Sequence, residues 1–126
     1  MYCLDTNILI DLIRGDKVIS EKINSLNENI FINPIIECEL FKGVYLSSKK
    51  DEQIDVVKEL IESFEILEFN NEVCEEFGKE YARLSKFGKL IPEFDLIIAC
   101  FAKVNNLVLV TRDNHFENTG IKIEVW

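Results

Sequence analysis

Short apolar runs alternate with longer amphipathic stretches along this chain, and this alternation limits the fold more than any other feature. The clearest apolar runs cover residues 2–4, 30–32 and 107–110. Each run has the length of a strand, and the stretches between them are long enough for helices. Strands that alternate with helices are typical of βα units, in which a helix connects one parallel strand to the next. We therefore predict an α/β fold built around a central parallel sheet.

Capping and turn residues set the boundaries of the predicted helices. Asn33 followed by Pro34 indicates a helix start, because Asn is a favoured N-cap and Pro is favoured at the first helical position. Thr6 is the expected cap of the first helix, and Gly15 and Gly88 are expected to end helices. The predicted helices cover residues 6–13, 18–26, 34–46, 51–63, 71–87 and 92–103, and weaker strands cover residues 65–69 and 121–125.

The net charge of the chain is concentrated in one segment. A length of 126 residues fits one domain with one core, so we expect residues 1–126 to form a single domain. The formal net charge of −9 argues against a non-specific nucleic-acid binder. However, residues 51–80 hold 11 of the acids and two of the bases and so carry that whole charge. Charges on helix faces are usually solvated, and we expect the acids of this segment to lie in solvent, away from any site.

The cysteine pattern, the N-terminus and the short apolar runs predict a cytoplasmic protein. The four cysteines have no CxxC spacing and there is one histidine, which disfavours a zinc site of the usual kind. We expect each cysteine to pack as a small apolar residue. The N-terminus lacks the basic region of a secretory signal, and no apolar run reaches the length of a membrane span. We therefore predict a soluble, cytoplasmic protein with reduced cysteines and no membrane partner.

Two acidic residues lie on helix faces that should be apolar. At about 100° per residue, Glu39 shares one face of its helix with Ile36, Leu40 and Val44. Asp95 is the only charged residue in the apolar stretch 94–102. An isolated buried carboxylate costs several kcal/mol unless a cation or hydrogen bonds compensate for it. Each acid is therefore either half of a buried salt bridge or part of a binding site.

Two further acids, Asp5 and Asp113, directly follow predicted strands. Ligands of open parallel sheets bind beyond the carboxyl ends of the strands, where these two residues lie. Each could instead cap the helical turn that follows it. Four clustered carboxylates repel one another and favour a hard divalent cation such as Mg²⁺ or Mn²⁺, which can activate water for phosphodiester cleavage. A P-loop enzyme is disfavoured because the chain has no glycine-rich phosphate loop.

Polar residues beside these acids have two interpretations each. Thr6 and Asn7 can orient a metal-bound water or only cap a helix, and Thr111 can support the site or simply end a strand. Arg112 can bind a phosphate or form a local ion pair. His115, the only histidine, is expected to have a surface or packing role, and its alternative is contact with water or substrate.

Four short motifs together resemble the PIN-domain ribonucleases. They are Leu4-Asp5-Thr6-Asn7, Glu39-Leu40-x-x-Gly43-Val44, Phe94-Asp95-Leu96-Ile97-Ile98-Ala99, and Val110-Thr111-Arg112-Asp113 followed by Phe116. Their order and spacing, and the length of the chain, are similar to those of VapC-type toxins of toxin–antitoxin pairs. The resemblance covers essentially the whole chain and implies a Rossmann-like α/β/α sandwich with a central parallel sheet.

The resemblance also implies an activity and partners. It implies an endoribonuclease dependent on Mg²⁺ or Mn²⁺, with Asp5, Glu39, Asp95 and Asp113 as catalytic and metal-binding residues. It implies an RNA substrate, a homodimer and a cognate antitoxin, part of which can enter the acidic groove. This chain departs from the pattern at one position. Some relatives carry a further acid two residues after the fourth motif position, where this chain has His115.

Other functions remain open at the level of sequence. A haloacid-dehalogenase-like phosphatase needs Asp-x-Asp after its first strand, but here the third residue is Asn7. A response-regulator receiver needs an Asp after its middle strand, where this chain has Glu68-Phe69-Asn70. A PIN-domain nuclease that processes RNA without being a toxin, and an inert PIN-like module that only binds a protein, are the remaining alternatives. For the nuclease hypothesis we expect cleavage to weaken with salt, through Lys42, Lys86, Lys89 and Arg112.

Overall fold

Five parallel strands form a single sheet at the centre of the molecule. The computed structural model describes residues 1–126, and its strands are ordered β3-β2-β1-β4-β5. Every neighbouring pair is parallel, as the alternation of strands and helices predicts. The strands are β1 (Tyr2–Leu4), β2 (Ile30–Ile32), β3 (Glu65–Ile66), β4 (Val108–Thr111) and β5 (Ile123–Val125).

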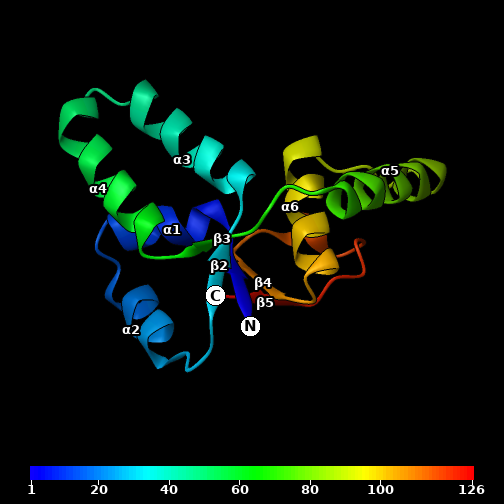
Figure 1. The fold of residues 1–126 in the computed structure, drawn as a ribbon, viewed down its shortest axis with the longest axis horizontal. Coiled ribbons are helices and arrows are strands. Elements are labelled where there is room, and N and C mark those ends of the chain that lie inside the picture. The colour runs from blue at the N-terminus through cyan, green and yellow to red at the C-terminus, as the bar shows by residue number, and fades with distance from the viewer.

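Six α-helices cover the sheet. Figure 1 shows α1, α2 and α4 on one side of the strands and α5 and α6 on the other, while α3 and α4 form a hairpin that extends beyond the sheet. The fold is therefore the predicted α/β/α sandwich. The helices are α1 (Thr6–Ile13), α2 (Lys17–Ser25), α3 (Pro34–Leu46), α4 (Lys50–Glu62), α5 (Asn71–Lys86) and α6 (Glu93–Val104), and a 3₁₀ turn, η1 (Asn114–Phe116), follows β4.

The predicted boundaries are confirmed where a capping residue sets them. The Asn33 side chain accepts hydrogen bonds from the N–H groups of Ile35 and Ile36, and Pro34 begins α3. Gly15 and Gly88 follow α1 and α5 with φ of 84° and 66°, the left-handed conformation that ends helices. At α1 the expected cap is wrong. Asp5, not Thr6, is the N-cap, because its carboxylate accepts from the N–H of Thr6.

The two weaker strands are shorter than predicted. The predicted strand over residues 65–69 is limited to Glu65–Ile66, and the last strand begins at Ile123 instead of residue 121. A strand exists only where a neighbour supplies hydrogen-bond partners. Strand β3 pairs only with Phe31 and Ile32 of the three-residue β2, so it ends where β2 ends.

The order of the strands creates a crevice between β1 and β4. From the central β1 the chain moves outward through β2 to β3, then crosses back through α5 and α6 to β4 on the other side of β1. The connections leaving β1 and β4 therefore diverge, which is the switch point where parallel α/β sheets bind ligands. Asp5 is the residue after β1, and Asp113 lies two residues after the end of β4.

The core lies around these two central strands. Cys3, Leu4, Leu109 and Val110 are fully buried, and so is Phe116 of the 3₁₀ turn. The backbone at the switch point is thus held by packing from both layers. No helix in the structure combines the length and the apolar character needed to cross a membrane.

Two expectations about buried and exposed residues are wrong. Cys3 and Cys100 are buried as predicted, but Cys38 and Cys74 are exposed, because they fall on the solvent sides of α3 and α5. In the acidic segment 51–80, most acids are exposed, but Glu80 is buried in contact with Arg83 and Lys103. Arg83, one turn further along α5, and Lys103 of α6 compensate for its burial, and the contact with Lys103 is not evident from the local sequence.

Candidate active site

Four elements bring the predicted acids to the switch point. Asp5 directly follows β1 and caps α1, and Asp113 lies after β4 and caps η1. Glu39 lies in α3, and Asp95 lies in the first turn of α6. Shared hydrogen-bond partners connect these acids. Asp5 also lies close enough to Asp95 and Glu39 for their charges to raise its pKa.

Asp5 is the most deeply buried of the four. Its carboxylate is held on both sides: the Thr111 hydroxyl donates to Oδ2 at 2.7 Å, and the Thr6 N–H donates to Oδ1 at 2.8 Å. The pKa of Asp5 is raised to about 6, mainly by burial; the negative charges of Asp95 and Glu39 also raise it, and the two hydrogen bonds act in the opposite direction. A carboxylate in this position is ionised most easily when a cation is present.

Glu39 is joined to Asp5 through Thr6. The Thr6 hydroxyl donates to Oε1 of Glu39 at 2.8 Å, while the N–H of the same residue donates to Asp5. Thr6 thus positions two acids from distant parts of the chain. Glu39 also borders a pocket of about 230 Å³ between α1, α3 and α4, whose apolar lining includes Ile10, Leu40 and Val57.

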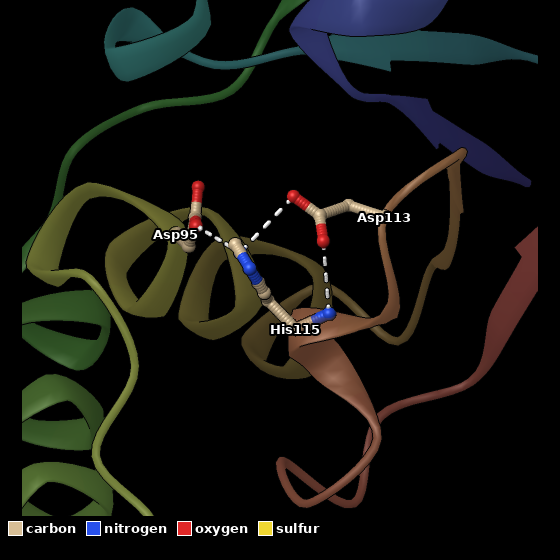
Figure 2. Close-up of side chains that lie close together, drawn as sticks. All are labelled: Asp95, Asp113 and His115. Atoms are coloured by element: carbon tan, nitrogen blue, oxygen red, sulfur yellow. Dashed lines mark hydrogen bonds and ion pairs between the residues drawn. The ribbon is translucent and has the colours of Figure 1, made fainter.

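Asp95 and Asp113 lie on either side of the His115 imidazole, as Figure 2 shows. Nδ1 of His115 is 3.2 Å from Oδ2 of Asp95 and 3.0 Å from Oδ2 of Asp113. These three side chains offer ligand atoms that all lie within 4.8 Å of one another. Asp5 lies outside this tightest group and is connected to it by Thr111, and Glu39 is connected to Asp5 by Thr6.

Thr111 connects Asp5 to Asp113. Its hydroxyl donates to Asp5 and accepts the Asp113 N–H at 3.0 Å. The Asn7 amide donates to the same hydroxyl, and the Arg112 N–H donates to the Asn7 side-chain oxygen, both at 3.4 Å. Thr111 therefore supports the site rather than simply ending a strand, and Asn7 braces it.

The Arg112 side chain pairs with acids other than the four of the candidate site. Its guanidinium pairs with Asp11 at 2.8 Å and with Asp16 at 3.4 Å, which favours the ion-pair interpretation over a phosphate contact. No lysine or arginine forms an ion pair with Asp5, Glu39, Asp95 or Asp113; the only ion pairs of these acids are those with His115. The candidate site is therefore rich in negative charge and contains no lysine or arginine that balances it.

The donor set fits a hard divalent cation. Carboxylate oxygens are the ligands that Mg²⁺ and Mn²⁺ prefer, and four of these groups gather here without a balancing Lys or Arg. Burial is the main cause of the raised pKa of Asp5, and no positive charge offsets it. His115 adds a nitrogen donor to this set.

His115 is the member of the cluster that sequence reasoning missed. A surface or packing role was expected for it, and its side chain is indeed about half exposed, but it contacts two of the four acids. The available signal was its position two residues after Asp113, where the family resemblance places another acid. Its contact with Asp95 joins residues 20 positions apart and depends on how α6 packs against η1.

Comparisons with known proteins give a consistent result. The profile described as "PIN domain" matches residues 2–122. Ribonuclease VapC1 of Haemophilus influenzae (strain R2866) is 35% identical over 116 residues, which is 90% of this chain and 87% of the relative. Ribonuclease VapC2 of Haemophilus influenzae (strain Rd) is 32% identical over 99% of this chain and 97% of the relative.

Solved structures agree over nearly the whole length. VapBC2 from Rickettsia felis, bound to a promoter DNA fragment, superposes with a TM-score of 0.93 at 29% identity and covers 99% of this chain and 98% of that one. VapBC-1 from nontypeable Haemophilus influenzae gives 0.87 at 34% identity, with 99% and 97% covered. The profile match and the identity to the VapC relatives, on top of the acids gathered at the switch point, show that this chain belongs to the PIN domain family.

Proposed function

We propose that this protein is a divalent-metal-dependent endoribonuclease and the toxin of a toxin–antitoxin pair, with residues 1–126 acting as one nuclease domain. The observation that most directly supports this proposal is that Asp5, Glu39, Asp95 and Asp113 meet at the switch point with no Lys or Arg to neutralise them. The relatives named ribonuclease VapC support RNA as the substrate.

The roles of the residues follow from their contacts. Asp5, Asp95, Asp113 and Glu39 would hold Mg²⁺ or Mn²⁺, which when bound lowers the pKa of water and stabilises charge on the phosphate. Thr111 fixes the spacing of Asp5 and Asp113, and Thr6 fixes Glu39 relative to Asp5. The core packing around β1 and β4 keeps these groups in place before substrate binds, which favours catalysis.

The RNA backbone requires positive charge near the acids. Lys42, Lys86 and Lys89 are exposed and form no ion pair, so they are available to phosphates. Arg112 is less available than the sequence indicates, because Asp11 and Asp16 already pair with it. We propose RNA contact through the three lysines, in the cytoplasm, where such a substrate is found.

A protein partner is the second part of the proposal. Three solved relatives, at 29%, 34% and 30% identity, are described as VapBC structures, which supports a cognate antitoxin for this chain, and we propose a homodimer as well. The pocket beside Glu39 offers such a partner apolar contacts from Ile10, Leu40 and Val57 next to the acidic group. Binding there would place the antitoxin beside the proposed catalytic residues.

The direct test is cleavage of RNA by the purified chain with Mg²⁺, with Mn²⁺ and with a chelator. We expect cleavage only with a divalent ion and a loss of about 1,000-fold for Asp5→Asn, which corresponds to about 4 kcal/mol of transition-state stabilisation. Asp51→Asn, an exposed carboxylate of α4, is the matched control and should retain activity.

Two results would contradict the proposal in different ways. Cleavage that persists in chelator or in Asp5→Asn would show that the acidic group does not carry the activity. Absence of both cleavage and calorimetric binding of Mg²⁺ or Mn²⁺ would favour an inert PIN-like module that only binds protein.

A further inference from the structure

The His115 imidazole is directed at the point where Asp95 and Asp113 converge. Its Nδ1 atom lies 3.2 Å from Oδ2 of Asp95 and 3.0 Å from Oδ2 of Asp113, so one ring nitrogen faces both carboxylates at once (Figure 2). The three ligand atoms lie within 4.8 Å of one another. A nitrogen that faces two carboxylate oxygens in this way is placed to share a cation with them.

Local structure holds the ring in that orientation. Asp113 caps the 3₁₀ turn: its Oδ1 accepts the His115 N–H at 3.0 Å, which leaves Oδ2 facing the imidazole. Phe116, the next residue, is fully buried and anchors the turn in the core. Asp95 approaches from the first turn of α6, which packs directly against η1. The position of the imidazole is therefore set by the backbone and the core, not by chance surface contact.

We propose that His115 is a ligand of the divalent cation together with Asp95 and Asp113, and that it shifts the preference of the site from Mg²⁺ toward first-row transition ions. This inference rests on the proposed metal-dependent function. Mg²⁺ prefers an all-oxygen set of ligands, whereas imidazole nitrogen favours the later divalent ions in the order Mn²⁺, Fe²⁺, Co²⁺. A neutral imidazole also gives the site one negative charge fewer than a carboxylate at this position would.

The test measures binding of Mg²⁺ and Co²⁺ by calorimetry in the wild type, His115→Asp and His115→Gln. We expect His115→Asp to change the ratio of Co²⁺ to Mg²⁺ affinity by at least about tenfold in favour of Mg²⁺. The visible absorption of bound Co²⁺ should change in both variants, because an oxygen or no ligand replaces the nitrogen. Glu117→Gln, an exposed acid just after η1, is the control and should leave both measurements unchanged.

The variants are informative because they do not threaten folding. The His115 side chain is 54% exposed, and circular dichroism of each variant checks its structure. The exposed Cys38 and Cys74 are shared by all variants, so any Co²⁺ bound there cancels in the difference spectra.

The outcomes separate this inference from the proposed function. If His115→Gln has the same Co²⁺ affinity and absorption as the wild type, the imidazole is not a ligand, and the proposal of metal-dependent cleavage is unaffected. A wild-type protein that binds neither ion would overturn both the ligand assignment and the metal-dependent function. If the His115 variants change metal binding but the wild-type protein does not cleave RNA, His115 is a metal ligand and only the nuclease proposal is contradicted.

Discussion

Asp5 and Glu80 are buried to nearly the same extent, 5% and 6% exposed, but their surroundings are opposite. Glu80 of α5 receives two N–H groups of Arg83, at 2.6 and 3.0 Å, and the Lys103 ammonium at 2.8 Å. Asp5 receives only a neutral hydroxyl and a backbone N–H, and the charges that act on it are those of other acids.

The pKa values of the two carboxyl groups reflect this difference. Burial raises the pKa of Glu80, but hydrogen bonds from Arg83 and Lys103, and their charges, outweigh it and leave the pKa below its usual range. Burial raises the pKa of Asp5 to about 6, and no positive charge opposes it. Glu80 therefore stabilises the fold by joining α5 to Lys103 of α6, whereas the ionised Asp5 destabilises it unless a cation binds.

Buried acids alone do not identify a functional site in this protein. The distinguishing property is whether the same structure also supplies the compensating cation. Glu80, Arg83, Lys103 and Glu76 form a neutral cluster, with Lys103 also 2.6 Å from Glu76. The acids at the switch point lack that compensation, and we interpret the lack as the mark of a metal-binding site.

Removing one charge from each region is the strongest test of this comparison. We expect Asp95→Asn to lower RNA cleavage by about 1,000-fold, yet to leave the thermal midpoint unchanged or higher, because repulsion with Asp5 is relieved. Glu80→Gln should leave cleavage unchanged but lower the free energy of unfolding by about 1–2 kcal/mol. This is less than the usual cost of breaking a buried pair, because both cations are about 40% exposed.

Urea unfolding and cleavage rates of both variants, measured side by side, show whether one variant loses activity and the other loses stability. A loss of stability in Asp95→Asn as large as that in Glu80→Gln would show that both regions are structural and would remove the distinction.

The pH dependence of stability should differ in sign between the two regions. The pKa of Asp5 is about 6 in the folded protein against 3.8 for the free group, so the metal-free fold binds this proton more tightly than the unfolded chain does. Below about pH 4 this group does not lower the free energy of unfolding of the metal-free protein. As the pH rises through about 6, the free energy of unfolding falls by at most about 3 kcal/mol. Glu80 acts in reverse: its contribution is present above the ordinary pKa of Glu and is lost as the pH falls through its lowered pKa.

Unfolding in chelator between pH 4.5 and 7 measures this effect. Asp5→Asn should flatten the profile, while Glu80→Gln should leave its shape above pH 5 intact. A wild-type profile that is flat over this range would contradict the assigned role of Asp5.

The smallest expected effect concerns the lysines outside both regions. Lys103 is committed to Glu76 and Glu80, whereas Lys42, Lys86 and Lys89 have no acidic partner. We expect RNA cleavage to weaken as the salt concentration rises. Each Lys→Ala change at these three positions should reduce, by about one unit, the slope of the logarithm of the RNA-binding constant against the logarithm of the salt concentration. Lys58→Ala, an exposed lysine in the acidic segment, is the control. Cleavage that is independent of salt would exclude a phosphate-contact role for these side chains.

Local chemistry explains why much of the fold could be predicted. The Asn33-Pro34 pair set the start of α3, and the apolar runs at 2–4 and 30–32 are strands at those residues. The two weak strands were overestimated, because strand length depends on the partner and not on propensity. All four predicted acids meet at the switch point. Residues that follow parallel strands lie at the same edge of the sheet, and residues on apolar helix faces are directed at the protein interior.

The sequence by itself therefore determined the alternation of strands and helices, the parallel sheet and the candidate acids, since these depend on neighbouring residues and on burial patterns. The tertiary structure alone decided that β1 lies beside β4, that His115 reaches Asp95, and that Lys103 compensates Glu80. These contacts join residues 20 or more positions apart, and no local propensity encodes the partner of a charge across that distance. Whether a buried acid stabilises the fold or attracts a metal is settled by that partner.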